Sequence, residues 1–270
     1  MLKFRKMHGL GNDFVILEGR DNGLSLSLEQ RRHLADRHRG VGCDQLIVIE
    51  RSYNFQETSF MRIYNPDGSE AGACGNAARC VAHILMTEDK VDNIVIETVG
   101  GVLNGWMAGP DQVKIDMGVP RLQWQDIPLA EKCDTLYLPL ENNPSAVSMG
   151  NPHCVYFMED ETDAEAGLRT LGPATETHPL FPQKTNVEFI NILSPDHIRM
   201  RVWERGAGIT QACGSGACAA VVAAVRRGLT GRHVTVRLDG GDLQIEWRES
   251  DDHVFMTGPV CYVFEGEINL

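Results

Sequence analysis

The sequence repeats itself at a spacing close to half its length, and this internal similarity constrains the fold more than any other feature. Four short motifs recur in the same order, each separated from its copy by 139 or 140 residues. The matched pairs are Gly11-Asn12 with Gly150-Asn151, Ala73-Cys74-Gly75 with Ala212-Cys213-Gly214, Gly100-Gly101 with Gly240-Gly241, and Met117-Gly118 with Thr257-Gly258. The 270 residues are therefore expected to form two domains of one fold, related by duplication and facing each other.

The break between the two copies falls near residues 118–145. This stretch carries Pro120, Pro128, Pro139 and Pro144, and it is interpreted as a linking region. We expect an N-terminal domain of residues 1–117, completed by a C-terminal strand at 259–270, and a C-terminal domain of residues 118–258.

The same elements are predicted in each half. Apolar residues alternate with polar ones on both sides of each glycine pair, which predicts β-hairpins over residues 94–103 and 234–247. The Ala-rich segments 76–86 and 215–227, each following a cysteine motif, favour helix. Because Ala and Val occur on all sides of these segments, both helices are expected to be buried and wrapped by strands.

Charge and composition exclude several classes of partner. The net charge is −12 and the basic residues are scattered, so we do not expect nucleic-acid binding. The N-terminus leads into His8 and Gly9 without the apolar stretch of a signal peptide, and no segment has the length of a membrane span. We therefore expect a cytoplasmic protein with no membrane partner, whose eight cysteines are reduced.

Cys74 and Cys213 are the strongest candidates for chemistry. Each is expected where a glycine-rich turn enters a helix, and the N–H groups and positive helix end there favour a thiolate and bind a carboxylate. Inversion at carbon needs a base on one face and an acid of matched strength on the other, which two symmetric thiols provide. An isolated Ala-Cys-Gly is more often a packing motif, but its duplication favours a functional role.

These motifs resemble the diaminopimelate epimerase family, and the resemblance covers essentially the whole chain. The motifs are Lys6-Met7-His8-Gly9-Leu10-Gly11-Asn12-Asp13-Phe14, the run from Asn65-Pro66-Asp67-Gly68-Ser69 to Cys74-Gly75-Asn76 and Arg79, Met149-Gly150-Asn151-Pro152-His153, and Glu204-Arg205-Gly206-Ala207-Gly208 continuing through Thr210 to Ala212-Cys213-Gly214-Ser215-Gly216. Ala77 departs from the usual glycine, and Pro66 from the usual small residue. Neither departure removes a side chain that does chemistry.

The resemblance implies an α+β fold of two pseudo-symmetric domains, each a strongly curved mixed β-sheet or barrel around a central buried helix. It implies an isomerase that needs no pyridoxal phosphate or other cofactor and acts as a homodimer. The implied reaction interconverts L,L-diaminopimelate and meso-diaminopimelate by proton transfer at the α-carbon, in lysine and peptidoglycan precursor biosynthesis.

The resemblance also implies roles for individual residues. Cys74 and Cys213 form the acid/base pair, and His153 and Glu204 lie near the two thiols. The substrate-binding residues implied are Asn12, Gln45, Asn65, Gly75, Asn76, Asn151, Asn186, Glu204, Arg205, Gly214 and Ser215. Among them the amides around Gly75-Asn76 and Gly214-Ser215 hold the reacting carboxylate, and Arg205 with Glu204 suits the distal amino-acid end. Taken alone, Asn12 favours a turn.

Other functions fit the sequence less well. The spacings Cys74-x5-Cys80 and Cys213-x4-Cys218, with His33 and His38, do not give the paired gaps of a structural zinc site, so no metal is expected. A dinucleotide fingerprint and a P-loop are also lacking. A racemase of histidine or proline on the same fold, and a non-catalytic amino-acid-binding protein, remain open as alternatives.

Overall fold

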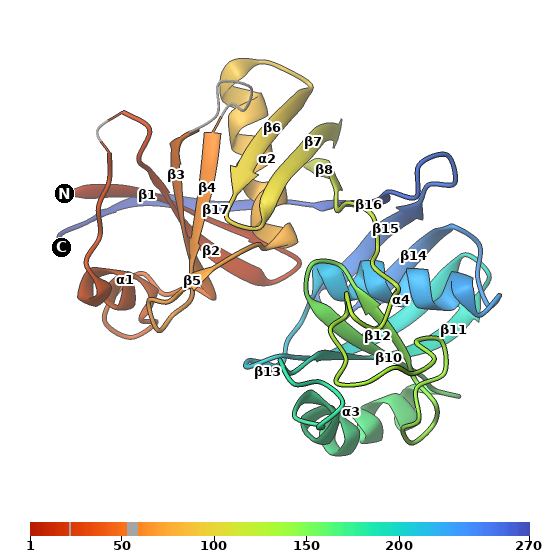
Figure 1. Cartoon of the computed structure of the whole chain (residues 1–270). Helices are drawn as coiled ribbons and strands as arrows, with labels where there is room; N and C mark the ends of the chain where they lie inside the picture. Colours follow the sequence, from red (N-terminus) through yellow and green to blue (C-terminus); the bar gives the residue numbers. More distant parts are fainter. Residues whose placement is uncertain (22, 53–58) are drawn as a thin grey trace. The chain divides into compact units, whose positions relative to one another are not determined.

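The chain divides into two compact units in the computed structural model, which describes residues 1–21, 23–52 and 59–270 (Figure 1). The first unit comprises Met1–Ile115 together with Thr257–Leu270, and the second comprises Asp116–Met256. The C-terminal strand of the chain therefore belongs to the first unit. It pairs there antiparallel with the N-terminal strand, Leu2 opposite Ile268.

The first unit is a mixed sheet with two helices. Its elements are β1 (Leu2–Gly9), β2 (Asn12–Glu18), α1 (Leu28–Ala35), β3 (Gln45–Arg51), β4 (Ser59–Tyr64), β5 (Glu70–Ala71), α2 (Gly75–Asp89), β6 (Asn93–Thr98), β7 (Gly101–Gly109), β8 (Gln112–Asp116) and β17 (Cys261–Ile268). From β1 the strands pair in the order β1–β2–β3–β4–β6–β7, and the pairings are antiparallel, parallel, antiparallel, parallel and antiparallel.

The second unit repeats this arrangement. Its elements are β9 (Ser145–Ser148), β10 (Pro152–Phe157), α3 (Glu161–Glu176), β11 (Asn186–Ser194), β12 (His197–Glu204), β13 (Gly208–Ile209), α4 (Gly214–Arg226), β14 (His233–Leu238), β15 (Gly241–Trp247) and β16 (Val254–Pro259). The pairing order β9–β10–β11–β12–β14–β15 shows the same alternation of antiparallel and parallel contacts. The predicted α+β fold and its duplication are confirmed.

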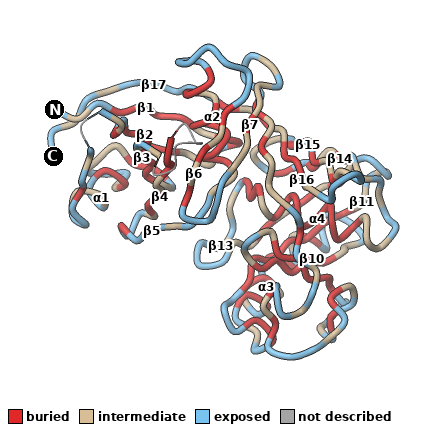
Figure 2. Tube along the Cα trace, turned by 45° about the horizontal axis from the view of Figure 1, so that its top comes forward, coloured by how far each residue is buried: buried red, intermediate tan, exposed pale blue. Residues whose placement is uncertain are grey.

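Each unit is built around one buried helix. In Figure 1, α4 passes between β14 and β15 on one side and β10 and β12 on the other, and α2 packs against β1, β6 and β7. The tube in Figure 2 is red along α4, where every residue from Ala217 to Ala224 has an exposed fraction of 0%. Small side chains all round the helix let strands approach from every direction, as the sequence predicted.

The repeated glycine pairs hold the cysteine loops in place. The N–H of Gly100 donates to the Gly72 carbonyl at 2.8 Å, two residues before Cys74, and Gly240 donates to Gln211 at 3.0 Å, two residues before Cys213. A Cβ on Gly100 would lie 2.8 Å from the Gly72 oxygen, so glycine is required for this approach. The following residues, Gly101 and Gly241, have φ of 129° and 131°, which side chains rarely adopt. Both predicted hairpins thereby pin the loops that precede α2 and α4.

The proline-containing stretch 118–145 is not a linker, and this expectation was wrong. It contributes Ile127, Leu129 and Leu138, all buried, to the apolar core of the second unit, where they join Phe189 of β11. The prolines allow an irregular path, but apolar residues between them anchor that path against the sheet. The prolines alone did not distinguish an irregular segment that packs in the core from a linker between domains.

Candidate active site

Cys74 and Cys213 occupy the same local position, because each is the N-cap residue of the buried helix of its unit. The Cys74 sulfur accepts a hydrogen bond from the Ala77 N–H at 3.5 Å, and the Cys213 sulfur accepts one from the Gly216 N–H at 3.4 Å. The predicted placement of both thiols at a helix start is confirmed. The first-turn amides there, with the helix dipole, suit a bound carboxylate.

In the first unit, Asn12 connects the cysteine loop to the sheet. Its Oδ1 accepts hydrogen bonds from Asn76 Nδ2 at 3.1 Å and from the Cys74 thiol at 3.8 Å, and its Nδ2 donates to Asp44 Oδ2 at 3.1 Å. Asn12 follows the β1–β2 turn, in which Leu10 and Gly11 both have positive φ. Its side chain therefore contacts the candidate thiol in addition to lying next to the turn.

Asp44 is itself fixed by neighbours that sequence reasoning missed. Its carboxylate accepts hydrogen bonds from the Asp13 N–H at 3.0 Å and from Arg37 at 2.7 Å. Arg37 and Lys6 both pair with the Asp13 carboxylate. Burial opposes ionisation of Asp13, but the hydrogen bonds from Arg37 and Lys6 outweigh it and hold the pKa of that carboxyl below its usual range. This ionic cluster keeps the polar residues beside Cys74 in one arrangement.

Gln45 and Asn65 form a second polar pair of the first unit. Residues Leu46 and Tyr64 are partners in the antiparallel β3–β4 ladder, which brings the adjacent Gln45 and Asn65 together. Gln45 Nε2 donates to Asn65 Oδ1 at 3.2 Å, and Asn65 Nδ2 donates to Ser69 Oγ at 3.1 Å. Both side chains are partly exposed, which leaves them available to a ligand.

In the second unit, a series of hydrogen bonds runs from Cys213 into the core. The Cys213 sulfur lies 3.7 Å from Ser215 Oγ, which accepts from Asn151 Nδ2 at 3.3 Å. Asn151 Oδ1 lies 3.0 Å from His153 Nε2, and His153 Nδ1 lies 2.7 Å from Glu188 Oε1. Four of the residues implied by the resemblance are thus connected, and the series ends on a carboxylate that the sequence reasoning did not include.

Glu204 ends β12 beside Cys213. Burial raises the pKa of the Glu204 carboxyl, although hydrogen bonds from Thr210 and from the Cys213 thiol oppose the rise. The Gly216 N–H at the helix start lowers the pKa of the Cys213 thiol, as expected, but larger effects oppose it. Burial raises the pKa of its thiol well above the ordinary value, and the charges of Glu204 and Glu188 raise it further. The helix-end amides are outweighed, so Cys213 rests as a thiol.

Asn186 and Arg205 are positioned by the backbone around them. Asn186 Nδ2 donates to the Pro152 carbonyl at 3.0 Å, and Asn186 Oδ1 accepts from the Arg205 N–H at 3.0 Å. Asn186 is buried, and both ends of its amide bond to backbone groups, at the start of β10 and at the turn after β12. The guanidinium of Arg205 is exposed and donates to the Gln183 carbonyl at 3.1 Å.

A polar pocket of about 360 Å³ opens next to these residues in the second unit. Arg205, Asn151, Gly150 and Gln183 line it, together with Arg121 from the irregular stretch. The lining also includes Gln125 and the carboxylate of Asp126, so the pocket carries two guanidinium groups, three side-chain amides and one acid. The two guanidinium groups suit a ligand that carries a carboxylate.

Glu188 was missed although the sequence carried a signal for it. It is the one charged residue in the β11 segment Asn186–Ser194, whose other buried side chains are apolar or amides. A charged side chain is almost never fully buried unless it is paired, and Glu188 has an exposed fraction of 0%. A lone carboxylate in an apolar strand should have been read as half of a buried pair.

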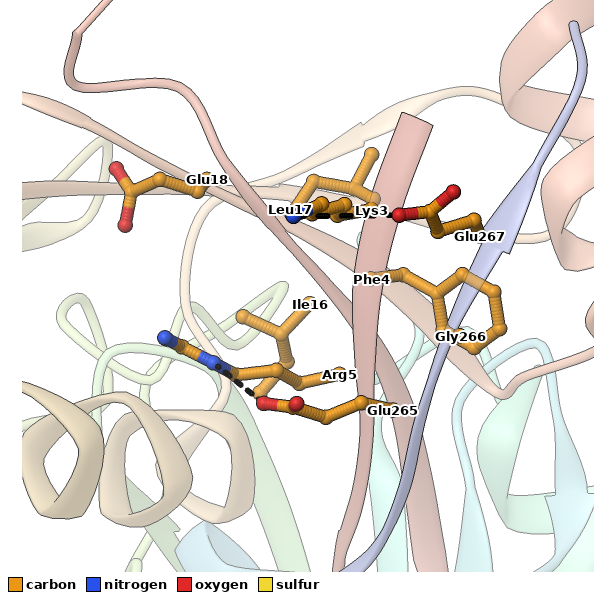
Figure 3. A pocket seen from close by; sticks show the side chains of 9 residues that line it. All are labelled: Lys3, Phe4, Arg5, Ile16, Leu17, Glu18, Glu265, Gly266 and Glu267. Carbon is orange, nitrogen blue, oxygen red and sulfur yellow. Dashed lines mark ion pairs between the residues drawn. The ribbon is translucent and has the colours of Figure 1, made fainter. Parts of the chain in front are cut away.

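Other ligand types find less support in the part of the chain that the structure describes. No group of three or more His, Cys, Asp or Glu residues is arranged there to hold a metal ion. A cavity of about 430 Å³ lies over β1, β2 and β17 and is lined by Lys3, Phe4, Arg5 and Glu267 among others (Figure 3). It contains none of the predicted site residues. Among the described residues, the helices are too short or too polar to span a bilayer.

Fold and site together define a class of protein: an α+β protein of two like units, each carrying a thiol at the start of its central helix. The profile of the diaminopimelate epimerase family matches residues 4–123 and 145–263. A diaminopimelate epimerase of Rhodospirillum centenum is 53% identical over 99% of this chain and 92% of its own length, and one of Gluconobacter oxydans is 55% identical over 98% of each. The chain belongs to the diaminopimelate epimerase family, a family of isomerases.

A solved structure shows the same fold at much lower sequence identity. A phenazine biosynthesis protein of the PhzF family from Bacillus anthracis superposes with a TM-score of 0.70 at 14% identity, covering 100% of this chain and 99% of that one. At this identity the match concerns the fold alone.

Proposed function

We propose that this protein interconverts L,L-diaminopimelate and meso-diaminopimelate, with Cys74 and Cys213 as the two proton carriers. The observation that carries the proposal is the duplicated N-cap thiol, present in both units at repeat-related positions. Membership of the diaminopimelate epimerase family over nearly the whole chain supports the choice of substrate.

In the proposed reaction one cysteine, as thiolate, takes the proton from the substrate α-carbon, and the other, as thiol, gives its proton to the opposite face. The S–H bond of the donor breaks as the new C–H bond forms, and no redox change occurs. The carbanion-like transition state places negative charge on the α-carboxylate. The first-turn amides Gly75-Asn76 and Gly214-Ser215, each at the positive end of a helix, are suited to stabilise that charge.

The distal amino-acid end of the substrate is assigned to polar residues around Arg205. Arg205 binds its carboxylate, and Glu204 attracts its ammonium group. Asn65, Asn151 and Asn186 complete this set, while Asn12 and Gln45 hold the first-unit side. The exposed guanidinium of Arg205 on the 360 Å³ pocket supports this assignment. The hydrogen bonds of Asn186 favour an indirect contribution, through the Arg205 backbone.

The test is a turnover assay that compares L,L-diaminopimelate with free proline, histidine and other single-centre amino acids, with incorporation of solvent deuterium at the α-carbon as a second readout. Epimerisation of diaminopimelate alone is expected. An Arg205→Lys variant should lose much of its diaminopimelate turnover while both cysteines stay reactive to alkylation. Turnover of another amino acid in preference, or deuterium exchange with none, would overturn the substrate assignment.

We further propose that the protein acts as a homodimer through β17. Tyr262, Val263 and Phe264 follow one another on this strand and are 48%, 49% and 46% exposed, an apolar run unusual for a free surface. The cavity of Figure 3 adjoins the same strand. Light scattering should give twice the chain mass, and Val263→Asp should halve it.

A cytoplasmic location is proposed because two working thiols need a reducing compartment.

A further inference from the structure

Glu188 and His153 form a hydrogen-bonded pair in the core of the second unit. Both side chains have an exposed fraction of 0%, and Nδ1 of His153 lies 2.7 Å from Glu188 Oε1. The other oxygen, Oε2, is buried with no hydrogen-bond partner among the described residues. Burying a carboxylate with one oxygen unpaired opposes folding, so the group needs an explanation other than stability.

The first unit shows that the fold does not require charges at these positions. His153 of β10 pairs in parallel register with Asn186 of β11, and Phe14 of β2 pairs in the same way with Gln45 of β3. Two residues further along, Glu188 therefore corresponds to Ile47. Phe14 and Ile47 are also 0% exposed, so one unit fills this part of its core with apolar groups where the other has a hydrogen-bonded histidine and glutamate.

The carboxylate of Glu188 lies against the first turn of α4, next to Cys213. A Cβ on Gly216 would lie 2.7 Å from Glu188 Oε1 and 3.2 Å from the Cys213 sulfur, so both atoms border the same small space. Glycine at this position lets the carboxylate reach the helix start. His153 in turn is fixed by Asn151, which connects through Ser215 to the thiol.

We propose that Glu188 is a positioning residue for proton transfer: held by His153 against the start of α4, its carboxylate keeps Cys213 as a thiol, ready to donate a proton, before substrate binds. This inference rests on the proposed two-thiol function. Glu188 gains and loses no proton in the reaction. Its negative charge disfavours a thiolate beside it, so the proton of Cys213 stays in place until the substrate carbanion takes it.

Other titratable groups lie near Glu188 and Cys213, and the design of the test takes them into account. Glu204 of β12 faces Cys213 from another strand, and its charge acts in the same direction as that of Glu188. Cys154 of β10 lies close enough to Glu188 for its own thiol pKa to be raised, after the larger effect of burial. Because several groups contribute, Glu188 is tested by substitution in the intact chain.

The experiment compares Glu188→Gln with the wild-type protein. Glutamine keeps the shape and a hydrogen bond to His153 but removes the charge. The rate at which iodoacetamide alkylates Cys213 is followed against pH by peptide mapping, which separates Cys213 from the other cysteines. We expect the midpoint to move to lower pH, so that Cys213 reacts roughly threefold to tenfold faster near neutrality. The pH optimum of diaminopimelate turnover should move in the same direction, because the enzyme loses its resting proton more readily.

Three variants separate positioning from structure. Glu188→Asp retains the charge and should restore the wild-type pH optimum. Tyr156→Phe deletes another buried hydrogen bond on β10, from Tyr156 to Thr175 at 2.9 Å, and should leave both pH profiles unchanged. If Glu188→Gln failed to fold, the paired variant His153→Phe/Glu188→Ile, which copies the first unit, would replace it and should show the same shift of Cys213.

The outcomes are distinct. If Glu188→Gln folds and its alkylation of Cys213 depends on pH as in the wild type, the role of Glu188 is overturned, whatever the activity of the variant. The alkylation profile of Cys213 can shift in a protein that turns over no diaminopimelate, because alkylation needs no substrate. That result would support the role of Glu188 and contradict the proposed function.

Discussion

The two units share a backbone plan but differ in the chemistry around their thiols. Strand order, strand direction and helix placement are repeated from β1–β7 to β9–β15, and each unit ends its cysteine loop at an N-cap. Around Cys74 the side chains include the amide of Asn12, which accepts hydrogen bonds from the thiol and from Asn76. Around Cys213 they include the carboxylates of Glu204 and Glu188.

This difference shows what duplication conserved and what it left free. Backbone requirements, such as the glycine pairs and the N-cap cysteines, are the same in both units because the strands and helices need them. Side chains one layer away differ: Phe14 and Ile47 are apolar, whereas His153 and Glu188 are polar and hydrogen-bonded to each other. The two thiols therefore share an N-cap geometry, while the side chains one layer away from them differ. Cys74 is also partly exposed, whereas Cys213 is buried.

The first prediction tests whether both units are needed for chemistry. Cys74→Ala and Cys213→Ala should each lower turnover of diaminopimelate by about 10²–10⁴-fold, because either change removes the proton carrier from one face of the carbon. Steady-state kinetics in both directions measures the loss. If either variant kept more than about a tenth of the activity, the two-base mechanism would be untenable.

Matched controls come from the same helices. Cys80 in α2 and Cys218 in α4 have an exposed fraction of 0% and serve as small apolar core residues. Cys80→Ala and Cys218→Ala should lower thermal stability slightly and leave turnover nearly intact. A large catalytic defect in a folded control would mean that the wrong thiols have been assigned.

The second prediction transfers the core of one unit to the other. In His153→Phe/Glu188→Ile the buried polar pair is replaced by the apolar pair of the first unit. Replacing a buried ionisable pair by apolar residues is often neutral or stabilising by about 1–4 kcal/mol, because the desolvation of the buried polar groups is avoided. Urea unfolding should therefore show no loss of stability, while turnover falls by about tenfold or more because His153 no longer orients Asn151. A strongly destabilised protein would show that packing, rather than charge, distinguishes the units.

The sequence predicted the parts of this protein that follow from local rules. The internal repeat identified the duplication, the Ala-rich composition identified α2 and α4 as buried helices, and the glycine pairs identified the hairpins. The N-cap positions of Cys74 and Cys213 followed from the turn before each helix. These features depend on residues close together in the chain or on the repeat itself.

Features that depend on distant contacts were not predicted. The Ile127 and Leu138 side chains turn the proline-containing stretch into part of a core, which no local pattern showed. The helix start was expected to favour a thiolate at Cys213, and the resemblance placed Glu204 near a thiol, but the burial that opposes ionisation was not visible in the sequence. Glu188 lies on β11 and Glu204 on β12, and both strands precede α4 in the chain. Their effect on the pKa of Cys213 appears only when the sheet brings them to the start of α4.

The third prediction concerns the other carboxylate beside Cys213. Because the charge of Glu204 raises the pKa of the Cys213 thiol, Glu204→Gln should lower it. The thiolate then forms at lower pH, and alkylation of Cys213 near neutral pH, without substrate, should become severalfold faster. The alkylation rate of Cys74, in the other unit, serves as the internal reference. Equal acceleration at both cysteines would indicate a general loosening of the protein instead of a local electrostatic effect.

The smallest expected effect compares the third residue after each cysteine, Ala77 in α2 and Gly216 in α4. Ala77→Gly should cost at most about 1 kcal/mol, the ordinary difference in helix propensity. Gly216→Ala gains that propensity, yet its Cβ would lie 2.7 Å from Glu188 Oε1, so we expect a net loss of stability and a displaced carboxylate. In a Glu188→Ala background this conflict disappears, and Gly216→Ala should become neutral or stabilising. Urea unfolding of the four proteins of this cycle measures the coupling. Additive effects of the two substitutions would mean that Gly216 is not kept to make room for Glu188, and that the two helix starts differ for a reason other than the buried carboxylate.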